Sequence, residues 1–198
     1  MNADSPLSLS LTEVAEAIET RKVSSFEVTQ SAIQRLETHG RDLNVVAEID
    51  SERALLAARN ADDELAAGRR RGPLHGVPLA HKDMYYRAGR ISGCGSRIRK
   101  DFVPDVTSTA LERLDAAGAL DIARLNMVEF AAGPSGHNEI VGTVSNPWNP
   151  DYLTGGLSRG PAAAGFDRVG FSAIGARTGG FPRGTPSAGR GGGVKGAL

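Results

Sequence analysis

The residue with the clearest chemical potential in this sequence is Lys82, which follows a short apolar run and stands between His81 and Asp83. The run, residues 77–80, comes after a turn rich in glycine and proline, and such runs are typical of buried strands. A lysine at the inner end of a buried strand must be paired, lose its charge or serve chemistry, and a neutral lysine can accept a proton. The alternative is a lysine that points into water, because most lysines in folded proteins are exposed.

The polar residues nearby do not suggest a metal site. His75 and His81 lack the spacing of a metal-binding pair on one helix or strand, and no cysteine or carboxylate joins them. Asp83 is expected to cap the turn that follows it. The single cysteine, Cys94, cannot form an internal disulfide, which favours a reducing compartment. We therefore expect no metal and no cofactor.

The elements that must position Lys82 are predicted from capping signals and apolar periodicity. Helices are expected near residues 8–20, 24–40, 51–67 and 107–117, with a short one over 126–131. Strands are expected near residues 44–49, 77–80 and 119–125. The order strand, helix, strand favours an α/β fold with a mixed sheet and some parallel pairing.

Composition limits the classes of partner. The chain has 198 residues, enough for one good core, and its 23 basic and 23 acidic residues give a formal net charge of zero. Nothing global therefore suggests nucleic acid or an anionic membrane as a partner. The N-terminus does not resemble a signal peptide, and no apolar run approaches the length of a membrane span. We expect a cytoplasmic protein.

Four stretches occur in an order that resembles the amidase signature family, serine hydrolases of amides. They are residues 72–78 with Lys82 and Asp83, 118–119 with 126–130, 146–150, and 154–156. The similarity covers residues 8–180 and implies a mixed sheet covered by helices, here incomplete. The sequences of residues 81–86 and 133–138 look more similar to those of free-standing bacterial amidases than to the glutaminase subunit of the tRNA amidotransferases. A glutaminase subunit of this kind stays an alternative.

The resemblance implies a Ser-Ser-Lys triad that acts on a small carboxylic amide. Lys82 matches the family lysine and would be the base, and Ser158 is the candidate for the serine that relays the proton. Thr178, Gly179 and Gly180 match the segment whose backbone N–H groups would hold the oxyanion. The reaction implied is hydrolysis of the amide to acid and ammonia through an acyl-serine intermediate.

Two positions depart from the family pattern. Leu157 follows the first glycine pair, and Phe181 follows the second pair 24 residues later. The spacing of the two family serines is therefore preserved, but this chain has no serine at either position. Phenylalanine has no nucleophilic atom, and Ser158 reaches the relay position only through a slip of one residue. The alternative is therefore a truncated and catalytically inactive remnant, produced by disturbances of the reading frame.

Composition changes at about the same point. Of the 25 glycines, 14 fall in the last 48 residues, and from Arg159 onward there are six basic residues and one acid. We expect residues 1–156 to be the N-terminal part of an amidase domain and 157–198 to be a degenerate Gly/Arg-rich remnant of the serine-bearing region, for which poor order is one expectation. An RNA-binding tail is disfavoured because aromatic residues and arginines do not alternate in repeats. A homodimer is left open.

Overall fold

The structure is a computed structural model that describes residues 6–132, 137–147, 149–153, 158–166 and 173–174. Its helices are α1 (Leu11–Glu19), α2 (Ser25–Arg35), α3 (Ser51–Ala66), α4 (Thr109–Ala116) and α5 (Arg159–Phe166). Its strands are β1 (Val46–Ile49), β2 (Pro78–Lys82), β3 (Leu120–Leu125), β4 (Ser145–Asn146), β5 (Asn149–Leu153) and β6 (Ala173–Ile174).

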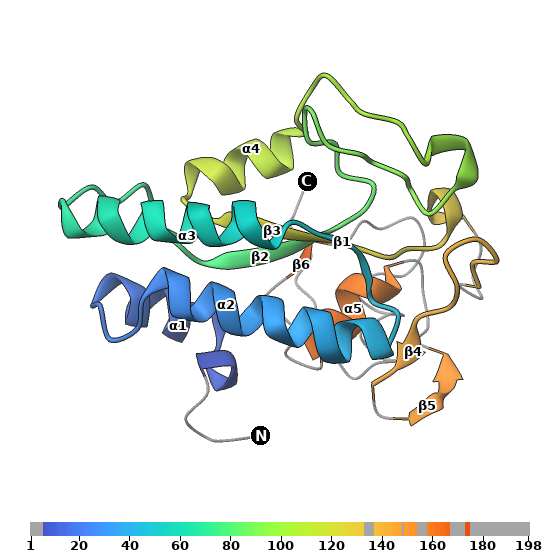
Figure 1. The fold of residues 1–198 in the computed structure, drawn as a ribbon, viewed down its shortest axis with the longest axis horizontal. Helices are drawn as coiled ribbons and strands as arrows, with labels where there is room; N and C mark the ends of the chain where they lie inside the picture. The colour runs from blue at the N-terminus through green and yellow to red at the C-terminus, as the bar shows by residue number, and fades with distance from the viewer. Residues whose placement is uncertain (1–5, 133–136, 148, 154–157, 167–172, 175–198) are drawn as a thin grey trace, which may run out of the picture.

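The central feature is a mixed sheet with the strand order β1-β3-β2-β6. Strand β2 is parallel to both β3 and β6, whereas β1 is antiparallel to β3. In Figure 1, α1 and α2 run below these strands and α4 lies above them, while the β4–β5 hairpin stands apart. The predicted α/β fold with a mixed sheet is confirmed.

Parallel pairing brings the carboxyl ends of β2 and β3 to one edge of the sheet. Lys82 pairs with Leu125, the last residue of β3. Side chains that follow either strand therefore lie close together, which is the usual place for a ligand site in an open α/β sheet.

Local signals set the helix starts. The side chain of Ser10 accepts a hydrogen bond from the Glu13 backbone N–H and the Glu13 carboxylate accepts one from the Ser10 N–H, so the predicted capping box is present, and Ser24 forms the same arrangement with Glu27. After Arg35, a π-helical turn carries α2 on to Gly40, where its predicted end lies. The alanine-rich face of α3 then packs on β3, and α2 packs against α3 and β2.

The short helix predicted over residues 126–131 is wrong in extent. Only a single 3-10 turn forms, at Glu129–Ala131. Phe130 and Ala131 have φ values of 49° and 53°, and a right-handed helix does not accommodate positive φ. The segment is therefore a tight turn that follows β3.

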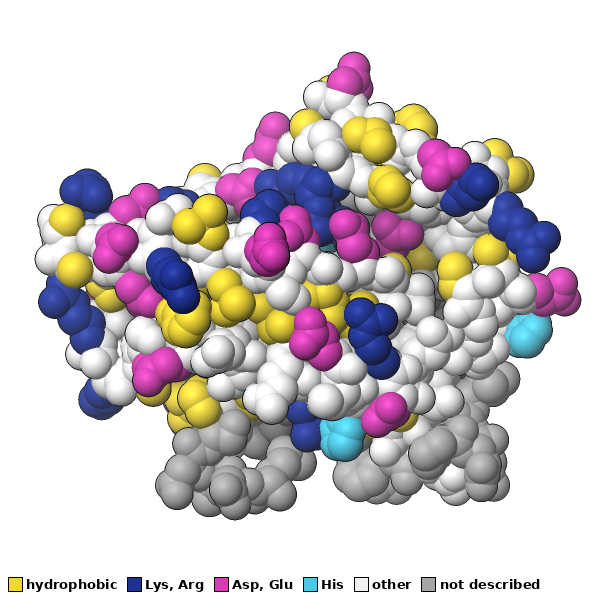
Figure 2. Space-filling view, in the orientation of Figure 1, with side chains coloured by type: hydrophobic (Ala, Val, Ile, Leu, Met, Phe, Trp, Pro, Cys, Tyr) yellow, Lys and Arg dark blue, Asp and Glu magenta, His cyan; other side chains and the backbone are white. Residues whose placement is uncertain are grey.

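The described surface agrees with the balanced composition. Figure 2 shows acidic and basic side chains interspersed over this face. Among the helices of the described residues, none combines the length and apolarity needed to cross a bilayer.

Candidate active site

Lys82 is fully buried at the carboxyl end of β2. Its Nζ donates a hydrogen bond of 3.0 Å to Oγ of Ser158, which is also fully buried. The structure thus brings together two of the predicted catalytic residues, 76 positions apart in the chain. The alternative in which Lys82 points into water is wrong.

Burial changes the acid–base behaviour of Lys82. Loss of solvent lowers the pKa of its ammonium group to about 8, and the Cys94 thiol acts in the opposite direction. Near pH 8, a large fraction of Lys82 is therefore neutral and able to accept a proton. Because Ser158 Oγ lies within hydrogen-bond distance, the pair has the geometry of a nucleophilic or relaying hydroxyl and its base.

Asn126, which directly follows β3, holds Ser158 in reach of Lys82. Its carbonyl accepts a hydrogen bond of 3.1 Å from the N–H of Gly160 in the first turn of α5. The side-chain Nδ2 of Asn126 donates to the carbonyls of Asn44 and Val46 at 3.0 and 3.2 Å. The start of α5 is thereby fastened to the strand that neighbours β2.

A glycine at position 160 is required by this contact. A Cβ on Gly160 would lie 2.3 Å from the Asn126 carbonyl oxygen and 2.9 Å from the Asn126 nitrogen. No backbone tolerates such an approach, so only glycine allows α5 to begin this close to β3.

The chain after Lys82 returns to the site through a glycine-rich loop. The Asp83 carbonyl accepts from the N–H of Cys94 at 3.1 Å, and its carboxylate accepts from the N–H of Gly93 at 3.3 Å. Cys94 has a φ of 52°, a conformation that non-glycine residues rarely adopt. The Asp83 carboxylate therefore caps the loop ten residues ahead, whereas the N–H groups of the turn that follows it bond to the Lys82 carbonyl.

Desolvation of Asp83 predicts a pH-dependent stability. Burial raises the pKa of this carboxyl to about 6, and the hydrogen bond from Gly93 and the charge of Arg124 oppose the shift. The folded protein then binds this proton more tightly than the unfolded chain, so stability from this group rises as the pH falls through 6. Relative to Asp83→Asn, we expect the unfolding free energy to increase by about 1.4 kcal/mol between pH 8 and pH 5.

Urea denaturation at several pH values measures this difference. Asp101→Asn is the control, because the Asp101 side chain is 82% exposed. Equal pH slopes for the wild type and Asp83→Asn would contradict the assignment.

A hollow of about 490 Å³ lies beside the loop. It is lined on its polar side by Asp83, Ser96 and Asn126, and on its apolar side by Ile91, Ile140 and Val141. Its volume is that of a site for a small molecule, and it shares Asp83 and Asn126 with the surroundings of Lys82.

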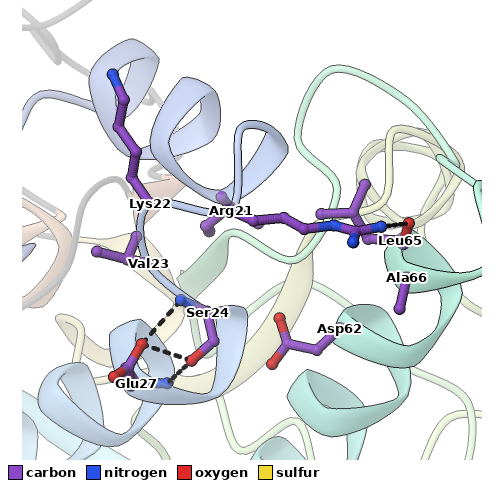
Figure 3. A pocket seen from close by; sticks show the side chains of 9 residues that line it. Arg21, Lys22, Val23, Ser24, Glu27, Asp62, Leu65 and Ala66 are labelled. Atoms are coloured by element: carbon purple, nitrogen blue, oxygen red, sulfur yellow. Dashed lines mark hydrogen bonds between the residues drawn. The ribbon is translucent and has the colours of Figure 1, made fainter.

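A second hollow, of about 300 Å³, lies between the α1–α2 turn and the end of α3 (Figure 3). Four of its polar side chains are engaged within the chain, those of Arg21, Ser24, Glu27 and Asp62. Arg21 donates to the Leu65 carbonyl at 2.6 Å, and the Asp62 carboxylate accepts from the backbone of residues 25 and 26. These contacts support helix packing, so we assign this hollow no catalytic role.

Comparison with known proteins identifies the scaffold. The sequence model of the Amidase family matches residues 27–187. The chain belongs to the amidase family. Among curated amidase-family relatives, it is 41% identical over 177 residues to a glutamyl-tRNA(Gln) amidotransferase subunit from Azoarcus sp. (strain BH72), covering 89% of this chain and 36% of that protein. The corresponding subunit from Methylococcus capsulatus is 42% identical over 173 residues, covering 87% and 36%.

Solved structures of amidases agree. A crystal structure of an amidase has a TM-score of 0.81 at 34% identity and covers 87% of this chain and 39% of its own. The peptide amidase of Stenotrophomonas maltophilia has a TM-score of 0.80 at 31% identity, covering 86% and 36%. The chain thus spans little more than a third of the relatives it matches. The matches include both classes, because the curated relatives carry the amidotransferase name and the solved structures are named amidases, so the preference for free-standing amidases stays a prediction.

Several positions implied by the amidase resemblance lie outside the described residues. They are Thr178, Gly179 and Gly180, expected at the oxyanion, and Leu157 and Phe181, which occupy the serine registers. The division of the chain at residue 156 stays a prediction. Across the part of the chain that the structure describes, no cluster of three or more His, Cys, Asp or Glu side chains could hold a metal ion.

Sequence reasoning missed a buried ionic network on the far side of Lys82. Arg124, only 1% exposed, places Nη2 3.2 Å from the carboxylate of Asp121, which also accepts from Arg87 at 3.0 Å. His81 is buried beside these charges, and loss of solvent lowers its pKa to about 4, so it carries no charge at neutral pH. The sequence did contain a signal for this network, because Asp121 and Arg124 are charged residues within the otherwise apolar strand β3.

Proposed function

We propose that this amidase-family chain hydrolyses a small carboxylic amide to acid and ammonia, with Lys82 as the general base. The observation that carries the proposal is the buried hydrogen bond of 3.0 Å between Lys82 and Ser158. A positioned base of this kind accelerates proton transfer by about 10² to 10⁴. We place the activity in the cytoplasm, the compartment that the single unpaired cysteine favours.

The steps follow from ordinary acyl transfer. Neutral Lys82 takes the proton of the Ser158 hydroxyl, and a serine oxygen attacks the amide carbon. The proton then passes from Lys82 to the leaving nitrogen, and water releases the acid from the acyl-serine. By family resemblance, the backbone at Gly179 and Gly180 would stabilise the oxyanion.

The names of the relatives suggest which amides to try first. The curated relatives are subunits of an amidotransferase named for glutamyl-tRNA(Gln), and one solved neighbour is a peptide amidase. Glutamine and a short C-terminally amidated peptide are therefore the first substrates to test. If glutamine is the substrate, the proposed role becomes that of a glutaminase-type subunit within a larger assembly.

An ammonia assay tests the proposal. Purified chain is incubated with glutamine, an amidated peptide and a simple alkyl amide, and ammonia is measured beside the Lys82→Met variant. We expect release by the wild type that rises with pH toward 8 and is absent from the variant. Equal release by both proteins would show that Lys82 is not the base.

A second candidate is an inactive remnant of an amidase, and Leu157 and Phe181 at the two serine registers favour it. In that case no ammonia appears, and the neighbouring DNA encodes Gly-Gly-Ser-Ser and Gly-Gly-Ser-Ile-Arg in another frame. Resequencing the gene decides: an uninterrupted frame that encodes both residues excludes the frame-shift explanation.

A further inference from the structure

We propose, resting on the amide hydrolysis proposed above, that Ser158 is itself the nucleophile of this chain and that Lys82 is its direct base. In the family pattern, a separate serine would occupy position 181, but this chain has Phe181 there and Leu157 at the other serine register. Neither side chain has an atom that could attack a carbonyl carbon. Ser158 is the serine whose hydroxyl is joined to the buried lysine.

The contact has the dimensions of a nucleophile and its base. The 3.0 Å between Lys82 Nζ and Ser158 Oγ falls inside the range of about 2.6 to 3.2 Å that such pairs show. Serine–lysine pairs without a third member are an established form of nucleophilic site. A third residue is therefore not required for the chemistry.

The pair is held on rigid elements. Lys82 lies in a strand bonded on both sides, to β3 and β6. Ser158 directly precedes α5, whose first turn is fastened to Asn126 through Gly160. A nucleophile and base fixed in this way lose little entropy when a substrate arrives.

The proposed reaction balances without any co-reactant except water. As Ser158 Oγ bonds to the amide carbon, its proton moves to Lys82 Nζ. The carbon–nitrogen bond then breaks, and Lys82 returns the proton to the nitrogen, which leaves as ammonia. Water attacks the ester, giving one proton to Lys82, and the carbon–oxygen bond to Ser158 breaks as that proton returns to Oγ.

Burial predicts which substrates this site accepts. Both side chains have no exposed surface, so a substrate must be small to reach Oγ. We expect acetamide or propionamide to react faster than an anilide of the same acid.

The experiment combines covalent labelling with hydrolysis. The full chain is treated with methanesulfonyl fluoride, a reagent close in size to acetamide, the modified residue is located by peptide mass spectrometry, and ammonia release from acetamide is measured in parallel. We expect one adduct on Ser158, no adduct at that position in Ser158→Ala, and labelling at least tenfold slower in Lys82→Met. Ser31→Ala, in the exposed part of α2, is the matched control and should label like the wild type.

The outcomes separate this inference from the proposed function. Ammonia release that persists in Ser158→Ala, or an adduct on another serine, overturns the role of Ser158 and leaves amide hydrolysis standing. An adduct on Ser158 without ammonia supports the nucleophile and overturns the proposed hydrolysis. Neither adduct nor ammonia overturns both.

A second variant guards against misfolding. Ser158→Cys keeps a nucleophile of similar size, and its alkylation by iodoacetamide is distinguished from that of Cys94 by peptide mapping. If Lys82 acts on this position, adding Lys82→Met should slow alkylation at residue 158 at least tenfold at pH 7.5. Unchanged alkylation would overturn the coupling.

Discussion

Replacing Lys82 with methionine is expected to abolish amide hydrolysis and to stabilise the folded protein at neutral pH. Loss of the base removes a rate factor of at least about 10². Methionine has a similar length and fills the same buried space without a charge to desolvate. A gain in stability together with a loss of function is typical of a residue kept for chemistry.

The sign of the pH effect follows from the lowered pKa of Lys82, about 8 in the folded protein against an ordinary 10.5. The unfolded chain binds this proton more tightly, so the wild type gains stability as the pH rises. Relative to Lys82→Met, we expect a gain of about 2.5 kcal/mol between pH 7 and pH 10. Chemical denaturation at both pH values measures it.

The exposed Lys100 supplies the control for this experiment. Lys100→Met should change neither ammonia release nor the pH dependence of stability by a measurable amount. A Lys82→Met protein that is less stable than the wild type at pH 7 would contradict the buried placement of the lysine.

Gly160→Ala is expected to separate Ser158 from Lys82 without altering either residue. The new methyl group would meet the Asn126 carbonyl at 2.3 Å, so α5 must move away from β3. Such overpacking against backbone costs about 3 kcal/mol of unfolding free energy. Because a displacement of about 1 Å costs about 10² in rate, hydrolysis and labelling at Ser158 should fall together.

Gly68→Ala is the matched control for this change. Gly68 ends α3 with a φ of 73°, and a Cβ there would meet nothing within 4 Å. Its cost is the backbone strain alone, about 1 kcal/mol, and labelling at Ser158 should be unaffected. If both variants lose the same stability and keep the same labelling, the contact between Gly160 and Asn126 does not position Ser158 beside Lys82.

Local rules predicted most of the scaffold. The two capping boxes fixed where α1 and α2 begin, because side-chain oxygens at Ser10 and Ser24 satisfy backbone N–H groups that no helical bond reaches. The order of strands and helices predicted parallel pairing, and β2 and β3 are parallel. The capping boxes depend on neighbours within a few residues, and the order of elements is counted along the chain, so a sequence shows both directly.

The site depended on contacts that no local pattern contains. The usual exposure of lysine favoured a Lys82 in water, whereas the apolar run of residues 77–80 and the family resemblance indicated a buried one. The fastening of Gly160 to Asn126, and the network around Asp121 and Arg124, join residues that tertiary packing brings together. The positive φ of Phe130 likewise overrode a helical pattern.

The 76-residue separation of Lys82 and Ser158 has a consequence for how the molecule assembles. Burial of the pair lowers the pKa of Lys82 from an ordinary 10.5 to about 8, so between these two pH values folding releases a proton to the solvent. Alkaline conditions therefore favour the assembled site, and this contribution to stability is lost as the pH falls from 10.5 to about 8.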